Sequence, residues 1–143
     1  MSGTTVVQNG RAKAYRPLPV EARRSAYVAA LEAYEAGDFF EAHELLEPAW
    51  MGTDDLAERA LHQGLIKLAA AFVHGVRGNP TGIAKNLVGA RAHLAAAIGS
   101  APAATSGLDL VALVGAIDDR LARLAADPTD ASVDPPALPR TAR

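Results

Sequence analysis

A histidine and two carboxylates stand close together in one short stretch of this sequence, amid aromatic residues. His43, Glu44 and Glu47 lie in the run 39–50, which begins with two phenylalanines and ends with Trp50. In a helix of about 3.6 residues per turn, His43 and Glu47 share one face with most of these aromatic residues. Such a face is expected to turn toward the core, where an isolated charge is costly to bury. The stretch therefore predicts groups that are paired, neutralised or bound to a ligand.

A second set of polar residues lies on one face of a later predicted helix. Gln63, Lys67 and His74 fall within about 60° of one another around the helix axis, beside small residues such as Gly64. Because small residues let a neighbouring helix approach closely, we expect this face to meet the one that carries His43. The predicted polar or ligand-binding cluster consists of His43, Glu44, Glu47, Trp50, Gln63, Lys67 and His74.

A structural network is the preferred interpretation of this cluster. Glu44 or Glu47 would pair with Lys67, and His43 would pair with His74, so that the two helices are held in register. Removing one partner of a buried ion pair costs about 3–5 kcal/mol. This interpretation therefore predicts that Lys67→Ala leaves a buried carboxylate unpaired and strongly destabilises the fold.

A metal site is the first alternative. Histidine and glutamate four residues apart on a helix can bind one metal ion, so His43 and Glu47 are candidate ligands, with His74 as a third. Glu44 would then be the general base of a metal-dependent hydrolase. However, Glu47 stands where the zinc-protease pattern H-E-x-x-H has its second histidine. Lys67 also argues against a metal, because an ammonium group repels a cation and competes for the same carboxylates.

A small-molecule pocket is the second alternative. Glu44 or Glu47 would act as a general base there, and Trp50 would form an apolar wall. Nothing in the sequence specifies a substrate. Whether the chain is an enzyme is therefore left open, and no cofactor is expected other than a divalent metal ion under the first alternative.

Helical periodicity runs through most of the sequence, and no segment alternates convincingly like a strand. Apolar residues recur every three or four positions, and glycine, proline and capping residues separate the segments. The predicted fold class is all-α, a compact bundle of about five helices. The helices are expected at about residues 19–36, 39–50, 56–77, 80–98 and 110–124.

The two ends of the chain lack this pattern. Residues 1–17 are polar, and residues 128–143 are rich in proline and small side chains. Such segments bury too little apolar surface to order themselves, so both are expected to be flexible or disordered tails. The expected organisation is a single helical domain over residues 18–127 between these tails.

Composition excludes several classes of function. Half of the 143 residues are hydrophobic and 21% are charged, which is typical of one globular domain. A net charge of −2 favours neither nucleic acid nor an acidic membrane as a partner. The absence of cysteine removes disulfides and thiolate chemistry. We expect a cytoplasmic protein without a membrane span, and the alanine-rich helix faces leave room for self-association.

Acids and bases are separated along the chain. Residues 25–58 contain nine acids and no lysine or arginine, whereas residues 59–108 contain five bases, three histidines and no acid. We interpret this order as an acidic pair of helices packed on a basic pair, with complementary charges that set their register. His62 and His93 lie outside the predicted cluster and are expected at the surface or its boundary.

Three motifs, in a fixed order, resemble those of a known family. They are Phe40-x-x-His43-Glu44-x-x-Glu47-x-x-Trp50, then Gln63-Gly64-Leu65-Ile66, then His74-x-x-Arg77-Gly78-Asn79. Over about residues 34–94 the chain resembles the domain-of-unknown-function 309 family. The resemblance implies a compact all-α fold without an established activity, sometimes labelled a predicted metal-dependent hydrolase. That family usually has glutamine where this chain has Lys67, which favours the ion-paired network. The sequence thus predicts a small helical domain whose polar cluster is structural or a weak ligand site.

Overall fold

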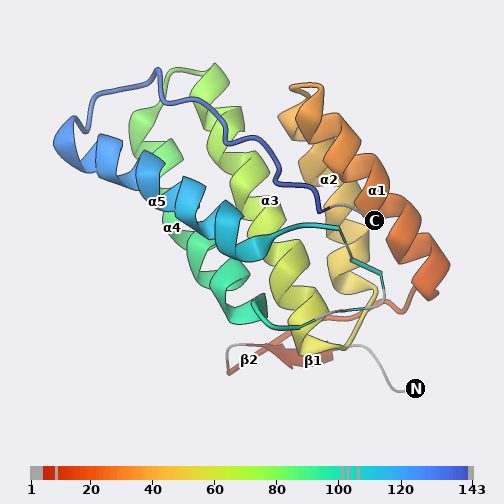
Figure 1. Ribbon diagram of the computed structural model, residues 1–143. Coiled ribbons are helices and arrows are strands. Elements are labelled where there is room, and N and C mark those ends of the chain that lie inside the picture. Colours follow the sequence, from red (N-terminus) through yellow and green to blue (C-terminus); the bar gives the residue numbers. More distant parts are fainter. Residues whose placement is uncertain (1–4, 9, 101, 103, 106, 142–143) are drawn as a thin grey trace.

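Five α-helices make up most of the computed structural model, which describes residues 5–8, 10–100, 102, 104–105 and 107–141. Figure 1 shows α3 in the middle, with α1 and α2 on one side and α4 and α5 on the other. The predicted all-α bundle is confirmed, and the helix ends differ from the predicted ones by at most two residues. The helices are α1 (Val20–Glu35), α2 (Phe39–Met51), α3 (Leu56–Val76), α4 (Pro80–Ala97) and α5 (Leu110–Ala126).

Short polar side chains determine where four of the helices begin. The Asp38 carboxylate accepts a hydrogen bond from the Glu41 backbone N–H at 3.2 Å and caps α2, as its sequence position predicts. Asn79 caps α4 in the same way through Gly82, and Pro80 occupies the first turn. Asp55 and Asp109 cap α3 and α5. The start of each of these helices is therefore encoded locally.

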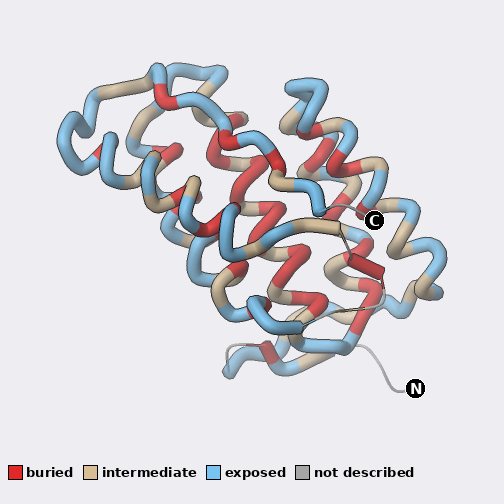
Figure 2. The backbone as a smooth tube through the Cα atoms, viewed as in Figure 1, coloured by how far each residue is buried: buried red, intermediate tan, exposed pale blue. Residues whose placement is uncertain are grey.

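The core surrounds α3, which is buried along most of its length (Figure 2). Leu61, Leu65, Leu68 and Phe72 of this helix pack against the buried residues of its neighbours. The contact of α3 with α4 is especially close, because a β-carbon at Gly64 would lie only 2.6 Å from the Leu94 side chain. A glycine is therefore required there for the two helices to meet.

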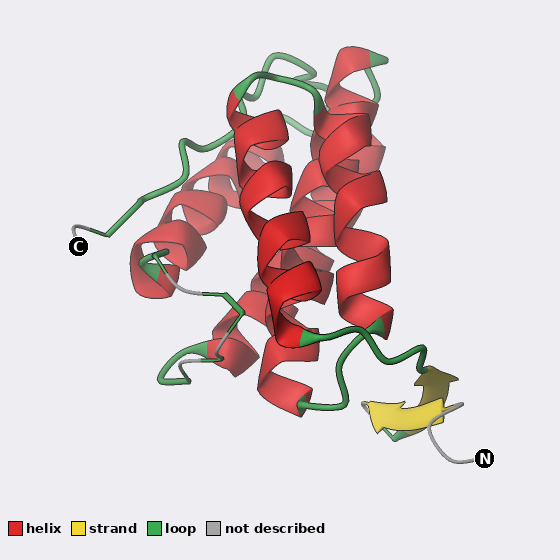
Figure 3. Cartoon of the chain, turned by 90° about the vertical axis from the view of Figure 1, so that its right-hand side faces the viewer, coloured by secondary structure: helices red, strands yellow, loops and turns green. Residues whose placement is uncertain are grey.

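A short hairpin precedes the bundle, in a region for which the sequence predicts a flexible tail. Strands β1 (Thr5–Gln8) and β2 (Arg11–Ala14) pair antiparallel, with Thr5 opposite Ala14. Figure 3 shows the hairpin at the end of the bundle where α2 passes into α3. Because a two-stranded hairpin is only marginally stable alone, its contacts with the helices account for its order.

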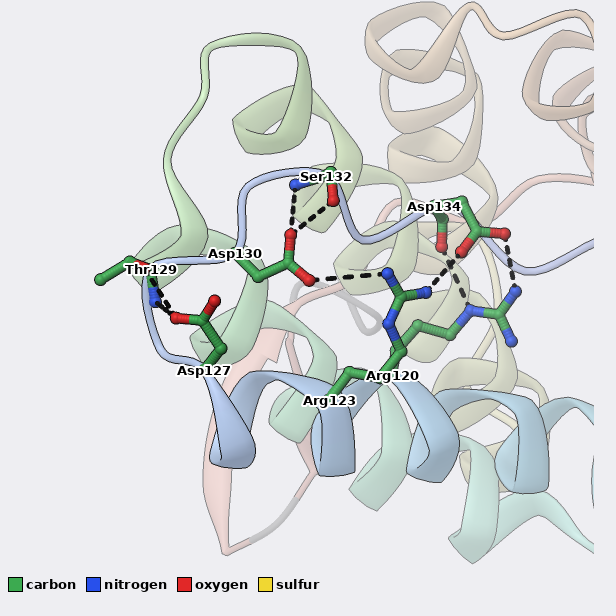
Figure 4. A network of polar contacts seen from close by, with 7 residues as sticks. All are labelled: Arg120, Arg123, Asp127, Thr129, Asp130, Ser132 and Asp134. Atoms are coloured by element: carbon green, nitrogen blue, oxygen red, sulfur yellow. Dashed lines mark hydrogen bonds and ion pairs between the residues drawn. The ribbon is translucent and has the colours of Figure 1, made fainter.

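The segment after α5 also packs on the bundle, although its composition predicts disorder. In Figure 4 the Asp134 carboxylate meets the guanidinium groups of Arg120 and Arg123, each at 3.0 Å. Farther along, the Tyr34 hydroxyl donates a hydrogen bond to the Pro136 carbonyl at 2.8 Å, and Leu138 is buried. Partners on α1 and α5 thus hold a segment without secondary structure. Residues 1–4 and 142–143 of the predicted tails lie outside the described residues.

No helix in the described part of the chain combines the length and the apolar character that crossing a membrane requires.

Candidate functional site

The most deeply buried charge of the structure is the guanidinium group of Arg59, near the start of α3. The Arg59 residue is 0% exposed. Its Nε donates to the Gln8 side-chain oxygen at 3.0 Å, Nη1 to the Thr53 carbonyl at 3.0 Å and Nη2 to the Ala14 carbonyl at 3.1 Å. The group also lies over the Trp50 ring, 4.8 Å from its centroid. Arg59 thus connects α3 to α2 and to both strands of the hairpin.

A second buried charge lies beside it, on Glu58. Arg23 of α1 donates to both oxygens of the Glu58 carboxylate, at 2.6 and 3.2 Å. The His62 Nε2 lies 3.1 Å from one of the same oxygens. Glu58 is 2% exposed and His62 is 0% exposed. We call Gln8, Arg23, Glu58, Arg59 and His62 the buried ionic cluster.

The electrostatics of this cluster favour the charged state of its acid. Burial alone would raise the pKa of Glu58, but the hydrogen bonds and positive charges of His62 and Arg23 lower it below its usual value. Burial lowers the pKa of Arg59, yet an arginine side chain stays protonated in proteins. The cluster therefore holds charges that the protein itself compensates.

Two polar atoms next to the cluster have no hydrogen-bond partner in the described residues. They are the Tyr27 hydroxyl and the His62 Nδ1, both shielded from solvent. The rings of Tyr27 and His62 meet edge to face, with centroids 6.1 Å apart. Burial raises the pKa of Tyr27, so this hydroxyl stays neutral. The aromatic contact, not a polar one, fills the space between these residues.

This cluster is not among the sequence-based predictions. They place His62 at the surface or its boundary and consider Glu58 and Arg59 only as part of the charge order along the chain. His62 was expected at the surface or its boundary, and that expectation is wrong, since the residue is fully buried. A signal was available, because Glu58 and His62 share the helical phase of the core residues Leu65 and Phe72. Charged residues in an apolar stripe predict a buried polar network.

The predicted residues of α2 lie elsewhere, on a more accessible face. The His43 ring stacks on Phe40, and His43 Nδ1 lies 3.3 Å from a Glu44 carboxylate oxygen. The Glu44 side chain is 52% exposed. Glu47 is half-buried, and within the described residues it forms no hydrogen bond or ion pair with its side chain. The structure brings His43 and Glu44 together but joins neither to α3.

Two of the predicted residues of α3, Lys67 and His74, contact α4 or its cap, which corrects the expected contact with α2. The Lys67 stem passes beside Gly89 of α4, where a β-carbon would lie 3.5 Å from it. His74 packs on Gly82 of the same helix, and its Nδ1 is 3.2 Å from the Asn79 amide nitrogen. The small residues of α3 therefore allow the close approach of α4, and the polar side chains follow that orientation.

The remaining predicted residues have separate surroundings. Trp50 joins the buried ionic cluster, because its indole N–H donates to the Gln8 side-chain oxygen at 3.1 Å. Gln63 is half-buried, and its buried side-chain oxygen has no partner among the described residues. That these residues bind a ligand stays a prediction.

Ion pairing across the helices differs from the interpretation of the charge order. Among the described residues, no lysine or arginine of 59–108 pairs with an acid of 25–58; Arg91, for example, pairs with Asp118 of α5. Direct lysine or arginine ion pairs between these two ranges therefore do not join the helices in the part of the chain that the structure describes. In the same part of the chain, no three histidine, aspartate or glutamate side chains are grouped as metal ligands would be.

Comparison with known families places these helices in context. Residues 27–86 match the family described as a domain of unknown function, DUF309, a range that runs from within α1 to within α4. No curated protein and no solved structure matches the chain. The matched range contains Glu58, Arg59 and His62 as well as His43 and Glu47. Over residues 27–86, the chain is similar to the DUF309 family.

Proposed function

We propose that this chain is a non-catalytic helical domain whose buried ionic cluster is structural and fastens the N-terminal segment to the bundle. The observation that carries the proposal is the saturation of the buried charges by protein groups. Each guanidinium nitrogen of Arg59 donates to a protein acceptor, and both carboxylate oxygens of Glu58 accept protein hydrogen bonds. A charge that is compensated in this way has no need of a ligand.

The position of the acceptors supports the same role. Arg59 reaches Gln8 of β1 and Ala14 of β2, whereas Arg23 connects α1 to Glu58 of α3 and also donates to the Leu18 carbonyl at 2.6 Å. Four of these six residues, Gln8, Ala14, Leu18 and Arg23, come before the middle of α1. The cluster thus acts on the chain segment that leads into the bundle.

A metal-dependent hydrolase is the alternative function, and one local observation favours it. His43 and Glu44 contact each other on an accessible face of α2, and Glu47 lies one helical turn beyond His43. In this alternative His43 and Glu47 are metal ligands, His74 is the third candidate ligand, and Glu44 is the general base. The orientation of His74 toward Asn79 requires that ligand to move.

Elemental analysis of the full chain, purified without chelator, separates the two functions. We expect zinc, iron and manganese well below one atom per chain in the wild type. Stoichiometric metal that is lost in His43→Ala and retained in His93→Ala would overturn the proposal in favour of the hydrolase. His93 is a suitable control because it is half-buried on α4, outside the candidate ligand set.

A further inference from the structure

An apolar groove opens at the end of the bundle where α2 begins and α3 ends. Its volume is about 290 Å³. The side chains at its rim are unusually exposed for their type, since Phe40 is 61% and Val76 is 79% exposed. Exposed aromatic and branched residues that line one groove are typical of protein–protein contacts. We call this surface the apical groove, lined by Gly37, Asp38, Phe39, Phe40, Val73, Val76 and Arg77.

Phe40 is not needed for the core, because its neighbour fills that place. The Phe39 ring packs against Tyr34 and Phe72, with centroid distances of 5.2 and 5.9 Å. Phe40 turns outward and stacks on the half-buried His43 ring, with centroids 6.4 Å apart and planes 12° from parallel. Phe40 thus presents an exposed aromatic ring at the surface of the groove.

Two opposite charges line the groove, Asp38 at the start of α2 and Arg77 at the end of α3. Asp38 is exposed, and in the described part of the chain only one of its carboxylate oxygens has a hydrogen bond, which it accepts from the Glu41 backbone N–H. Arg77 is exposed and forms no ion pair among the described residues, with Asp38 or with any other acid.

We infer that the apical groove binds a second copy of this chain in a two-fold symmetric dimer. In such an interface both protomers contribute the same patch. If one residue of the first protomer contacts another residue of the second, the reverse contact also forms. A groove with an acid on one side and a base on the other is complementary to itself under that symmetry. Asp38 of each protomer then pairs with the other protomer's arginine, and Phe40 and Val76 pack at the centre. The inference is independent of the role of the buried ionic cluster.

Sedimentation velocity of the full chain over a concentration series tests this inference. We expect the wild type to form a dimer, and we expect Phe40→Ser and Val76→Glu each to raise its dissociation constant by at least about tenfold. Val111→Glu is the matched control, because Val111 is 65% exposed but lies on α5, outside the apical groove. A wild type that stays monomeric, or a dimer that both groove variants leave intact, would overturn the inference. If the wild type is monomeric, a different protein would be the partner that binds the apical groove.

A charge exchange tests the two-fold pairing itself. Asp38→Arg and Arg77→Glu each place like charges together in the symmetric dimer, so each variant alone should be monomeric. An equimolar mixture restores two opposite-charge contacts, and dimers should therefore reappear. Melting temperatures show that both variants are folded, which matters because Asp38 also caps α2. Dimers formed by either variant alone, or a mixture that stays monomeric, would contradict the proposed pairing.

Discussion

Glu58 keeps its charge in the core because donors surround its carboxylate. Arg23 and His62 together contact both oxygens, and this hydrogen bonding outweighs the cost of burial for the pKa. Arg59, one residue farther along, is satisfied by neutral acceptors and by the Trp50 ring. Adjacent residues of opposite charge are therefore buried by two different sets of partners.

The pH dependence of stability follows from the pKa of Glu58. Its folded-state pKa lies below the usual value of 4.5, so its contribution to the free energy of unfolding is present above that pH and is lost as the pH falls through the folded-state pKa. Glu58→Gln removes this contribution. Urea unfolding should be measured from neutral pH to below pH 4.5. The difference in the free energy of unfolding between wild type and variant should become smaller as the pH falls.

A matched control isolates the buried carboxylate. Glu41→Gln alters an exposed acid of α2 outside the buried ionic cluster and is the comparison variant over the same pH range. A Glu58→Gln protein whose unfolding free energy runs parallel to that of the wild type would show that the carboxylate does not titrate with folding.

At the scale of the elements, the rotation of α3 decides which predicted residues meet. The sequence correctly indicates a helix face with small residues and with Lys67 and His74, but it does not say which neighbour occupies that face. Gly64, Gly82 and Gly89 show that α4 does, because a β-carbon at any of them would contact a side chain of the opposite helix. Either α2 or α4 could pack on this face of α3, and the periodicity of the sequence does not distinguish between the two helices. The expected contact of His43 with His74 failed for this reason.

Lys67→Ala measures the consequence of that rotation. The side chain is half-buried and has no ion pair among the described residues, so its loss removes packing of its methylene stem on Gly89 and leaves no carboxylate unpaired. The free energy of unfolding should fall by about 1 kcal/mol or less. Leu68→Ala, at the adjacent and fully buried position, should cost about 2–5 kcal/mol. A decrease of about 3 kcal/mol or more in the free energy of unfolding of Lys67→Ala would contradict this prediction and support the buried ion pair that the sequence suggests.

At the scale of the whole molecule, the described segments before α1 and after α5 pack on the helices. The helices could be located from capping residues and apolar spacing, because both signals are local. The hairpin and the segment after α5 could not, because their order depends on residues far away in sequence, such as Arg59 with Ala14 or Tyr34 with Pro136. The same holds for the buried ionic cluster, which joins residues of β1, α1 and α3. The spacing of apolar residues along the chain does not predict contacts between residues that are far apart in sequence.

Hydrogen–deuterium exchange of Arg59→Met tests most directly whether the cluster fastens the N-terminal segment. The variant leaves the Thr53 and Ala14 carbonyls without the Arg59 donor, at about 1–3 kcal/mol for each buried group that stays unpaired, and the Gln8 oxygen keeps the Trp50 N–H. A hairpin released from the bundle is marginal by itself, so the amides of Thr5–Gln8 and Arg11–Ala14 should exchange much faster while those of α4 stay protected. Arg91→Met, which breaks an exposed pair with Asp118, should leave the hairpin unchanged. Hairpin exchange that is the same in Arg59→Met as in the wild type would contradict the structural role of the cluster.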